Sequence, residues 1–376
     1  MSRDTIILFQ RIIPSYRVSI FKQLFYRFGI ITCHSKERKK GKVKSAQEQI
    51  DYPNELIGRF YYQREEAAVV QNIFKPLLKY RPKIVISQFS FKYFTFWLLF
   101  ILKPIFRYKL IVWTHGIQNK EREKPFITFR GRLSLFFYRN VDAIILYSNE
   151  IKDLFIAHRV TTKPIYVAKN TIDTYSLRDK LIALQQVNRD KLKLELGFTT
   201  KYSIVYIGRL LKSKNIELLC GVFDNMPSTL DVALHIIGDG EEHDLVLQKS
   251  RQNKRIVYHG AVYDDSLNSK LLYCSDMLLI TGEVGLSIIH GFCFGLPLIT
   301  VKGVSHGPEI DFLKDGINGF FVDADTNAIV IKISEILADD LKLQLLKQNA
   351  LDSAYNACSV ENFLNGFDEA INFFKT

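Results

Sequence analysis

Two basic residues follow a short apolar run in the second half of the chain. The run Ile204 to Ile207 leads into Gly208, and Arg209 and Lys214 come soon after it. A guanidinium binds phosphate through paired hydrogen bonds, and an ammonium adds a compact positive charge. Because glycine lets a ligand approach the backbone, this turn is suited to a diphosphate. A surface strand end with basic neighbours is the alternative that the turn alone leaves open.

A glycine-rich stretch, TGEVGLSIIHGFCFGLPLIT, runs from Thr281 to Thr300. Gly282 and Gly285 predict a turn into a short helix, whose first backbone N–H groups have no partner within the helix. Such a helix start can bind an anion. A buried turn that serves only stability is the alternative. Further glycine turns follow apolar runs at Gly238 and Gly260.

Two candidate sites occur in the first half. Tyr16 and Arg17 follow the first apolar run, and His115-Gly116 follows a later one. A histidine at a strand end can exchange protons near neutral pH or bind a ligand as a neutral ring. A structural histidine with its hydrogen bonds satisfied is the alternative.

The elements that must position these residues show one repeated pattern. Short apolar runs alternate with segments of helical spacing, for example Ser19 to Phe28 and Glu65 to Leu78. This alternation predicts an α/β protein built on parallel sheets with helices on both faces. The expected strands are 5–9, 29–33, 84–87, 110–113, 143–147, 164–167, 204–207, 232–237, 256–258, 277–280, 298–301 and 319–322.

The length of 376 residues favours two domains, because single cores stop growing near ~250–300 residues. The pattern restarts after a polar, helix-forming bridge, Ser176 to Gly197. We expect one domain over 1–173 and a second over 174–357. Residues 358–376 are expected to form a helix that can cross back to the first domain. A functional cleft is expected between the domains, where strand carboxyl ends meet.

The charge is divided unequally along the chain. Residues 1–175 carry 31 basic and 13 acidic residues, so the positive excess of the first half is larger than the net charge of +12 of the whole chain. Nucleic acid is one possible partner for this half, and aromatic residues among the basic ones also fit an anionic lipid surface. The segment 88–102 fits an amphipathic helix or a core helix. No apolar run reaches the ~20 residues that a membrane span needs, and the first apolar run is too short for a secretory signal. Five scattered cysteines argue against a disulfide framework or a zinc site.

Taken together, the motifs resemble those of the retaining, nucleotide-sugar-dependent glycosyltransferases of family 4. The resemblance is densest over residues 200–325 and thinner, but in the same order, before them. The stretches that carry it are 206–210 with 214–215, 237–240, 275–286, 290–299 and 315–320, and in the first half 14–17, 113–116 and 170–173.

The resemblance implies a GT-B fold, in which two Rossmann-like domains face each other, and a retaining transfer of a sugar. It implies that the N-terminal domain over 1–173 binds the acceptor and that the domain over 174–357 binds the nucleotide sugar. It implies catalytic roles for His115, Arg209, Lys214 and Glu283, and an acceptor contact for Tyr16 and Arg17. The residues implied to bind the donor are Gly208, Gly238, Gly282, Val284, Gly285, Leu286 and His290.

One pair of positions departs from the family pattern. The family usually carries two glutamates eight positions apart, and this chain has Gly282 and His290 there. We expect Glu283 to substitute for the first glutamate. Neutral His290 can both donate and accept hydrogen bonds, as a ribose hydroxyl pair requires. Glu309, further on, is interpreted as a charge favouring a helix dipole, with a site carboxylate as the alternative.

The expected enzyme needs no cofactor and no metal, because Arg209, Lys214 and the N–H groups around Gly285 and Leu286 would stabilise the leaving diphosphate. Its expected partners are a nucleotide sugar, a saccharide acceptor carried on a polyprenyl diphosphate, and an anionic membrane surface, but no nucleic acid. These place it in the cytoplasm, peripheral on the inner face of the membrane, in polysaccharide or lipopolysaccharide assembly. The alternatives are a non-catalytic nucleotide-sugar-binding subunit and a nucleotide-sugar epimerase. A dehydrogenase is disfavoured, because no GxGxxG follows the first apolar run.

Overall fold

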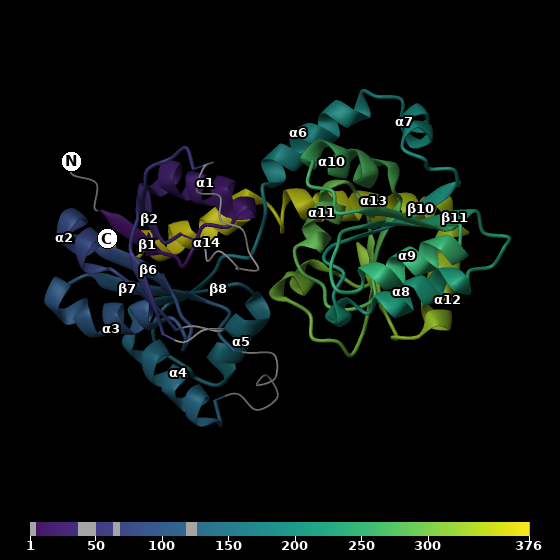
Figure 1. Cartoon of the computed structure of the whole chain (residues 1–376). Coiled ribbons are helices and arrows are strands. Elements are labelled where there is room, and N and C mark those ends of the chain that lie inside the picture. The colour runs from purple at the N-terminus through teal and green to yellow at the C-terminus, as the bar shows by residue number, and fades with distance from the viewer. Residues whose placement is uncertain (1–4, 37–49, 63–67, 118–125, 376) are drawn as a thin grey trace. The chain divides into compact units, whose positions relative to one another are not determined.

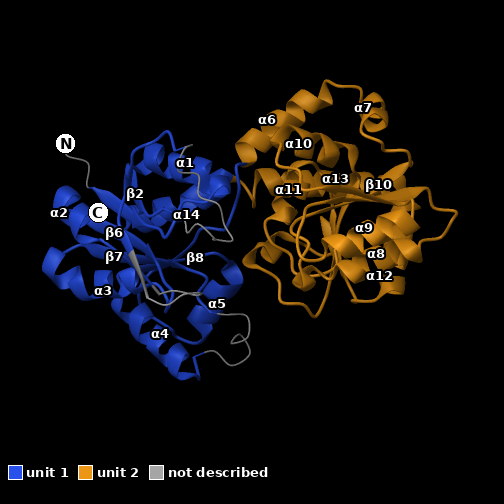
Figure 2. Cartoon of the chain, viewed as in Figure 1, with its two compact units in different colours: residues 1–173, 360–376 blue, residues 174–359 orange. Residues whose placement is uncertain are grey.

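The computed structural model describes residues 5–36, 50–62, 68–117 and 126–375. The chain divides into two compact units, coloured separately in Figure 2. Unit 1 consists of residues 1–173 together with 360–376, and unit 2 consists of residues 174–359. The division therefore falls after Asp173 and again after Ser359.

Unit 1 is built on a parallel sheet of seven strands in the order β3-β2-β1-β6-β7-β8-β9 (Figure 1). Residues of β1, β6 and β8 are almost entirely buried, as in parallel sheets covered on both faces. The strands are β1 (Ile6–Phe9), β2 (Ile30–His34), β3 (Asn54–Leu56), β6 (Ile84–Gln88), β7 (Lys109–Thr114), β8 (Ala143–Leu146) and β9 (Ile165–Val167).

Helices cover both faces of this sheet, as the apolar clusters show. Phe21 of α1 and Phe367 of α14 belong to the cluster on one face. Leu77 of α2, Leu99 of α3, Phe137 of α4 and Phe155 of α5 belong to the cluster on the other. The helices are α1 (Val18–Phe28), α2 (Phe74–Tyr80), α3 (Phe94–Phe106), α4 (Phe129–Asn140), α5 (Asn149–Ala157) and α14 (Val360–Asn372).

The structure corrects one expected helix. The segment Glu65 to Leu78 was expected to be helical throughout, whereas its described part forms strand β5 (Ala68–Gln71) followed by α2. β5 pairs antiparallel with β4 (Arg59–Tyr62), which was not expected, and neither was the edge strand β3. The backbone N–H of Gln71 bonds to the Thr95 hydroxyl, so contacts across the fold specify the strand here.

The last helix, α14, completes the core of unit 1. Phe363 and Phe367 meet the ring of Trp113 edge-on, with ring centroids 5.7 and 5.2 Å apart. A Cβ on Gly366 would lie 2.2 Å from the backbone oxygen of Val167, so the helix backbone contacts β9 directly. Residues from the far end of the sequence thus support the strands that carry the first-half motifs.

Unit 2 holds a second parallel sheet, with strands in the order β12-β11-β10-β13-β14-β15. The strand order reverses between β10 and β13, which are neighbours with Ile204 opposite Met277. The strands are β10 (Tyr202–Ile207), β11 (Val232–Ile237), β12 (Ile256–Gly260), β13 (Met277–Ile280), β14 (Leu298–Val301) and β15 (Gly319–Val322).

Eight α-helices accompany this sheet in the described part of unit 2. Side-chain caps begin several of them, as where the Asp325 carboxylate accepts from the Ala328 N–H. The helices are α6 (Thr174–Gln185), α7 (Arg189–Glu195), α8 (Ile216–Asp224), α9 (His243–Gln252), α10 (Asp265–Cys274), α11 (Ser287–Cys293), α12 (Thr326–Leu337) and α13 (Asp340–Tyr355).

The predicted fold class is confirmed, since each unit is Rossmann-like with a parallel sheet between helices. Among the described residues, no helix has the length and apolarity needed to cross a membrane.

Candidate functional site

Two motifs of unit 2 lie close together, the basic turn at the carboxyl end of β10 and the glycine-rich loop at the carboxyl end of β13. In open parallel sheets, ligands bind outside the carboxyl ends of strands at the point where the strand order reverses. The turn after β10 carries Arg209 and Lys214, and the loop after β13 runs from Thr281 to Leu286. The Thr281 hydroxyl donates to the Asn215 carbonyl oxygen at 2.9 Å, so the two loops are in contact.

Arg209 lies exposed at the end of β10. The hydroxyl of Tyr206 donates to the Arg209 carbonyl oxygen at 2.9 Å, and the Leu210 N–H donates to Asp239 O at 2.9 Å. These bonds fix the backbone of the turn while its guanidinium stays open to solvent. Gly238 lies on the adjacent turn, where a Cβ would stand 1.8 Å from Gly208 O. The two predicted glycines therefore pack backbone against backbone.

Lys214 is half-buried and donates a hydrogen bond from Nζ to the carbonyl oxygen of Glu283. Desolvation lowers the pKa of Lys214, and the charge of Arg209 acts in the same direction, whereas Glu283 and Glu309 oppose it. These four charged groups thus share one neighbourhood. A cation that is partly removed from water interacts more strongly with an anionic ligand than an exposed one does.

Gly282, which was expected to bind the donor, packs tightly against the turn after β10. A Cβ there would lie 2.4 Å from Ser213 O and 2.5 Å from the carbonyl carbon of Lys214. The Glu283 N–H donates to Ser213 O at 3.0 Å, which holds the two backbones together. Any side chain at position 282 would therefore displace the backbone that carries Lys214.

A histidine that the sequence analysis did not select holds the other side of this loop. Nδ1 of His306 accepts the Val284 N–H at 3.1 Å, and Nε2 lies 3.0 Å from the carbonyl oxygen of Val301. Because a carbonyl only accepts, the proton belongs on Nε2, and the ring is neutral. The Gly307 N–H also donates to Val284 O at 2.9 Å. Val284 is fully buried, with both backbone groups bonded within the protein.

The remaining predicted donor residues lie at the start of α11. Gly285 and Leu286 are half-buried and precede the helix, and a Cβ on Gly285 would meet no atom within 4 Å. His290 lies within α11, which packs against α6. Desolvation lowers the pKa of His290 to about 4, with Lys180 acting in the same direction and Asp265 opposing it. Its charged neighbours thus differ from those of Lys214.

The first-half motifs form a second cluster, within unit 1. Arg17 is buried, and its guanidinium donates to the Asn170 side-chain oxygen at 2.7 Å. The same group lies 5.1 Å from the ring centre of Trp113 and 5.9 Å from that of Tyr147. Tyr16, beside it, is 46% exposed. Arg17 therefore joins three segments of unit 1, while Tyr16 faces solvent.

His115 belongs to the same cluster. Its ring stacks on Tyr147 with centroids 4.3 Å apart. Desolvation lowers the pKa of His115, and the positive charge of Arg17 acts in the same direction. Gly116 adopts φ +77°, and its carbonyl oxygen accepts the Tyr138 hydroxyl at 2.8 Å. The strand end thus presents a neutral imidazole from a fixed turn.

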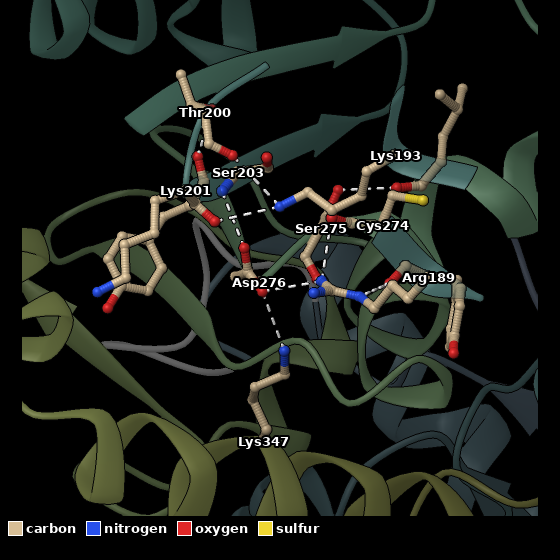
Figure 3. A network of polar contacts seen from close by, with 12 residues as sticks. Arg189, Lys193, Thr200, Lys201, Ser203, Cys274, Ser275, Asp276 and Lys347 are labelled. Atoms are coloured by element: carbon tan, nitrogen blue, oxygen red, sulfur yellow. Dashed lines mark hydrogen bonds and ion pairs between the residues drawn. The ribbon is translucent and has the colours of Figure 1, made fainter. Parts of the chain in front are cut away.

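Asp276, another residue of the motifs that carry the resemblance, lies just before β13, at the amino-terminal end of that strand. Figure 3 shows its buried carboxylate between Arg189 and Lys347, 2.9 and 3.2 Å from their nitrogens. The Ser203 N–H donates to its other oxygen at 2.9 Å. This network joins α7, β10, β13 and α13, so it is a structural anchor away from the loops that carry Lys214.

Among the residues that the structure describes, no group of three His, Cys, Asp or Glu side chains is placed to hold a metal ion. The described cysteines are buried and form no disulfide with one another.

Comparison with known proteins places both halves of the chain in one class. Residues 201–339 match the model described as "Glycosyl transferases group 1", and residues 21–176 match "Glycosyltransferase Family 4". Both parts of the chain are therefore similar to domains of glycosyltransferases, and the fold is of the two-domain GT-B class.

Named relatives are distant. The sulfoquinovosyl transferase SQD2 of Arabidopsis thaliana is 24% identical over 209 residues, which are 54% of this chain and 39% of that enzyme. Across the curated relatives that it matches, the chain spans from 39% to 66% of their length.

Two solved structures are similar in fold over nearly the whole chain. Anabaena Alr3699/HepE in complex with UDP has a TM-score of 0.70 at 16% identity, covering 98% of this chain and 99% of that one. The lipopolysaccharide outer core galactosyltransferase WaaB has a TM-score of 0.65 at 15% identity, covering 97% and 99%.

Proposed function

We propose that this protein transfers a sugar from a nucleoside-diphosphate sugar to a saccharide acceptor, with retention of the anomeric configuration and without a metal ion. The observation that carries the proposal is the pairing of Arg209 with Lys214 at the point where the unit 2 sheet reverses its strand order. Preorganised charge aimed at the leaving group is usually the largest catalytic contribution in such a site.

In the proposed step, the bond between the sugar C1 and the diphosphate oxygen breaks as the acceptor oxygen bonds to C1. A phosphate oxygen of the leaving diphosphate takes the acceptor proton. Arg209 and Lys214 stabilise the charge that develops on the diphosphate, together with N–H groups near Gly285 and Leu286. His290 forms hydrogen bonds with the ribose hydroxyls of the nucleotide, and neutral His115 contacts the donor sugar. Glu283 replaces the missing family glutamate.

A uridine diphosphate sugar is the donor class that we propose, because the similar HepE structure was solved with UDP and also with UDP-glucose. For the acceptor we propose a saccharide carried on a polyprenyl diphosphate at an anionic membrane surface, where Tyr16 and Arg17 contribute to its binding. The excess of basic residues over 1–175 supports that location, and the similar WaaB fold supports a role in lipopolysaccharide or polysaccharide assembly.

Lys212 offers a matched control for the proposed diphosphate site. It belongs to the same 3-10 helix as Lys214 (Lys212–Lys214) but is exposed, whereas Lys214 contacts the loop after β13. We expect Lys214→Ala and Arg209→Ala each to weaken UDP binding at least tenfold, ~1.4 kcal/mol, in isothermal titration. Lys212→Ala should bind UDP as the wild type does. Equal affinities in all four proteins would refute the diphosphate assignment.

The packing of Gly282 favours one alternative, a subunit that binds a nucleotide sugar without turning it over. The backbone of Ser213 and Lys214 occupies the space into which the first family glutamate would extend. Incubation with UDP-sugars and a mixed pool of saccharide acceptors separates the two functions. Released UDP supports the transferase, whereas tight UDP binding without release supports the binding subunit.

A further inference from the structure

Three helices on one face of unit 1 carry exposed apolar side chains. α2, α3 and α4 all pack on the same face of the sheet through the cluster that contains Leu77, Leu99 and Phe137. Their outer sides form what we call the α2–α4 face (Figure 1). Its exposed apolar residues are Phe74, Leu78, Phe94, Ile101, Ile105, Phe129 and Phe136.

The apolar residues of α3 form a continuous stripe along that helix. Phe94, Leu98, Ile101 and Ile105 recur every three or four residues, which places them on one side of an α-helix. Ile101 and Ile105 are 63% and 69% exposed, although single isoleucines of this kind are usually buried. The opposite side of α3 is already occupied, because Phe96 and Leu99 are fully buried in the core. The stripe is therefore a second apolar side, not the core side.

The charges on the three helices have one sign. Every residue of α2, α3 and α4 is described, and none is acidic, whereas six are basic. They are Lys75, Lys79, Lys103, Arg130, Arg132 and Arg139. The next helix on the same face, α5, carries Glu150 and Asp153, so the pattern ends there.

Exposed leucines elsewhere lack this setting. Leu341 and Leu345 of α13 are 83% and 62% exposed and stand one helical turn apart, as Ile101 and Ile105 do. However, α13 also carries Asp340 and Asp352. Lys75 and Lys79 of α2 both pair with Glu55, at 2.8 and 2.6 Å. What distinguishes the α2–α4 face is therefore the combination of apolar tips with helices whose own charged residues are all basic.

A basic hollow of about 580 Å³ lies between the ends of α3 and α4. Lys103, Arg107 and Lys109 line it, and Asp142 is its acidic member. Lys103 is 2.7 Å and Lys109 3.9 Å from the Asp142 carboxylate, so one negative charge is shared among these cations. The hollow keeps a net positive charge beside Ile101, as suits a phosphate group held next to apolar chains.

We propose that the α2–α4 face docks on an anionic lipid bilayer, with a lipid phosphate in the hollow lined by Lys103, Arg107 and Lys109. A bilayer offers both things that this face requires, an apolar interior for Ile101 and Ile105 and phosphates for the cations beside them. A nucleic acid offers the phosphates but nothing for an aliphatic stripe. The inference deepens the proposed function, since it names the surface that would bring the enzyme to a lipid-linked acceptor.

The test is flotation of the whole protein with vesicles made of equal parts phosphatidylglycerol and phosphatidylcholine. We expect the wild type to float with them, to float less as salt rises, and to stay behind with pure phosphatidylcholine. Ile101→Glu with Ile105→Glu should reduce partitioning more than tenfold. Arg107→Glu should reduce it at least fivefold, since each basic residue near the surface is worth about that factor. The matched control, Leu341→Glu with Leu345→Glu, should float as the wild type does.

UDP binding, measured on the same proteins, separates this inference from the proposed function. Variants of the α2–α4 face should bind UDP as the wild type does, and Lys214→Ala should still float. Failure of the wild type to float overturns the inference, and so does equal flotation of the Ile101 and Leu341 variants. If the wild type did not bind UDP, the proposed function would be overturned, whereas the vesicle-docking inference would be unaffected.

Discussion

Substitution of Gly282 tests whether the two loops of unit 2 are packed as described. A methyl group at this position would stand within 2.6 Å of three backbone atoms of Ser213 and Lys214. Backbone atoms cannot turn aside as a flexible side chain can, so the loops must separate. Overpacking of this kind costs about 1–3 kcal/mol of the free energy of unfolding.

For a unit of this size, each kcal/mol corresponds to roughly 2–4 °C in melting temperature. We therefore expect Gly282→Ala to melt about 2–12 °C below the wild type in differential scanning calorimetry. Because the displaced backbone carries Lys214, the same variant should bind UDP about tenfold more weakly in isothermal titration.

Gly285→Ala is the matched control, since its methyl group would meet no atom within 4 Å. It lies three residues further along the same loop and should melt close to the wild type. If Gly282→Ala kept wild-type stability and UDP affinity, the close approach of residue 282 to Lys214 would be refuted. Equal losses in both variants would show that the loop tolerates no side chain for another reason.

Two further predictions concern titratable groups of unit 2. Desolvation opposes ionisation of Asp276, yet Lys347, Arg189 and the Ser203 N–H together lower its pKa. The ionised carboxylate therefore stabilises the fold fully above pH ~3.9, the pKa of an unfolded Asp, and this stabilisation is lost as the pH falls through the lower pKa of the folded state. Asp276→Asn should lower the free energy of unfolding by about 3–5 kcal/mol at neutral pH and show a shallower acid dependence in urea titrations, whereas an unchanged acid limb would contradict the assignment. Desolvation lowers the pKa of His306, Lys214 acts in the same direction, and the Val301 carbonyl and Glu283 oppose them. Acid should protonate Nδ1 below pH ~6.5 and break its hydrogen bond to the Val284 N–H, so UDP affinity should fall in that range. His306→Ala lacks this protonation step, and identical pH profiles of UDP affinity in the wild type and the variant would exclude this role.

The fold followed from local patterns in the sequence. Buried strands such as Ile204 to Ile207 are short apolar runs that end at glycine, so both their type and their position are visible without the structure. Strand β3 lacks such a run, and Asn54–Leu56 is a strand only because it extends the sheet beside β2. The runs of β4 and β5 are apolar, but β5 lies in a segment that was interpreted as helical. Contacts across the fold decided those elements.

The sites were predicted as residues but not as contacts. Arg209 and Lys214 stood out by charge and spacing, whereas the contact of Gly282 with Ser213 joins positions that are distant in the chain. His306 gave no signal of its own, because a histidine between two glycine turns looks like many others. Arg17 was predicted to contact the acceptor, and the structure adds its contacts with Asn170, Trp113 and Tyr147.

The return of α14 to unit 1 has a consequence for biosynthesis. Trp113, which lies under Arg17, takes two of its aromatic neighbours from Phe363 and Phe367. During translation those phenylalanines leave the ribosome only after all of unit 2 has been made. Unit 1 therefore cannot complete its core until α14 has been synthesised, and the growing chain must keep an unfinished, aromatic-rich core from aggregating until then.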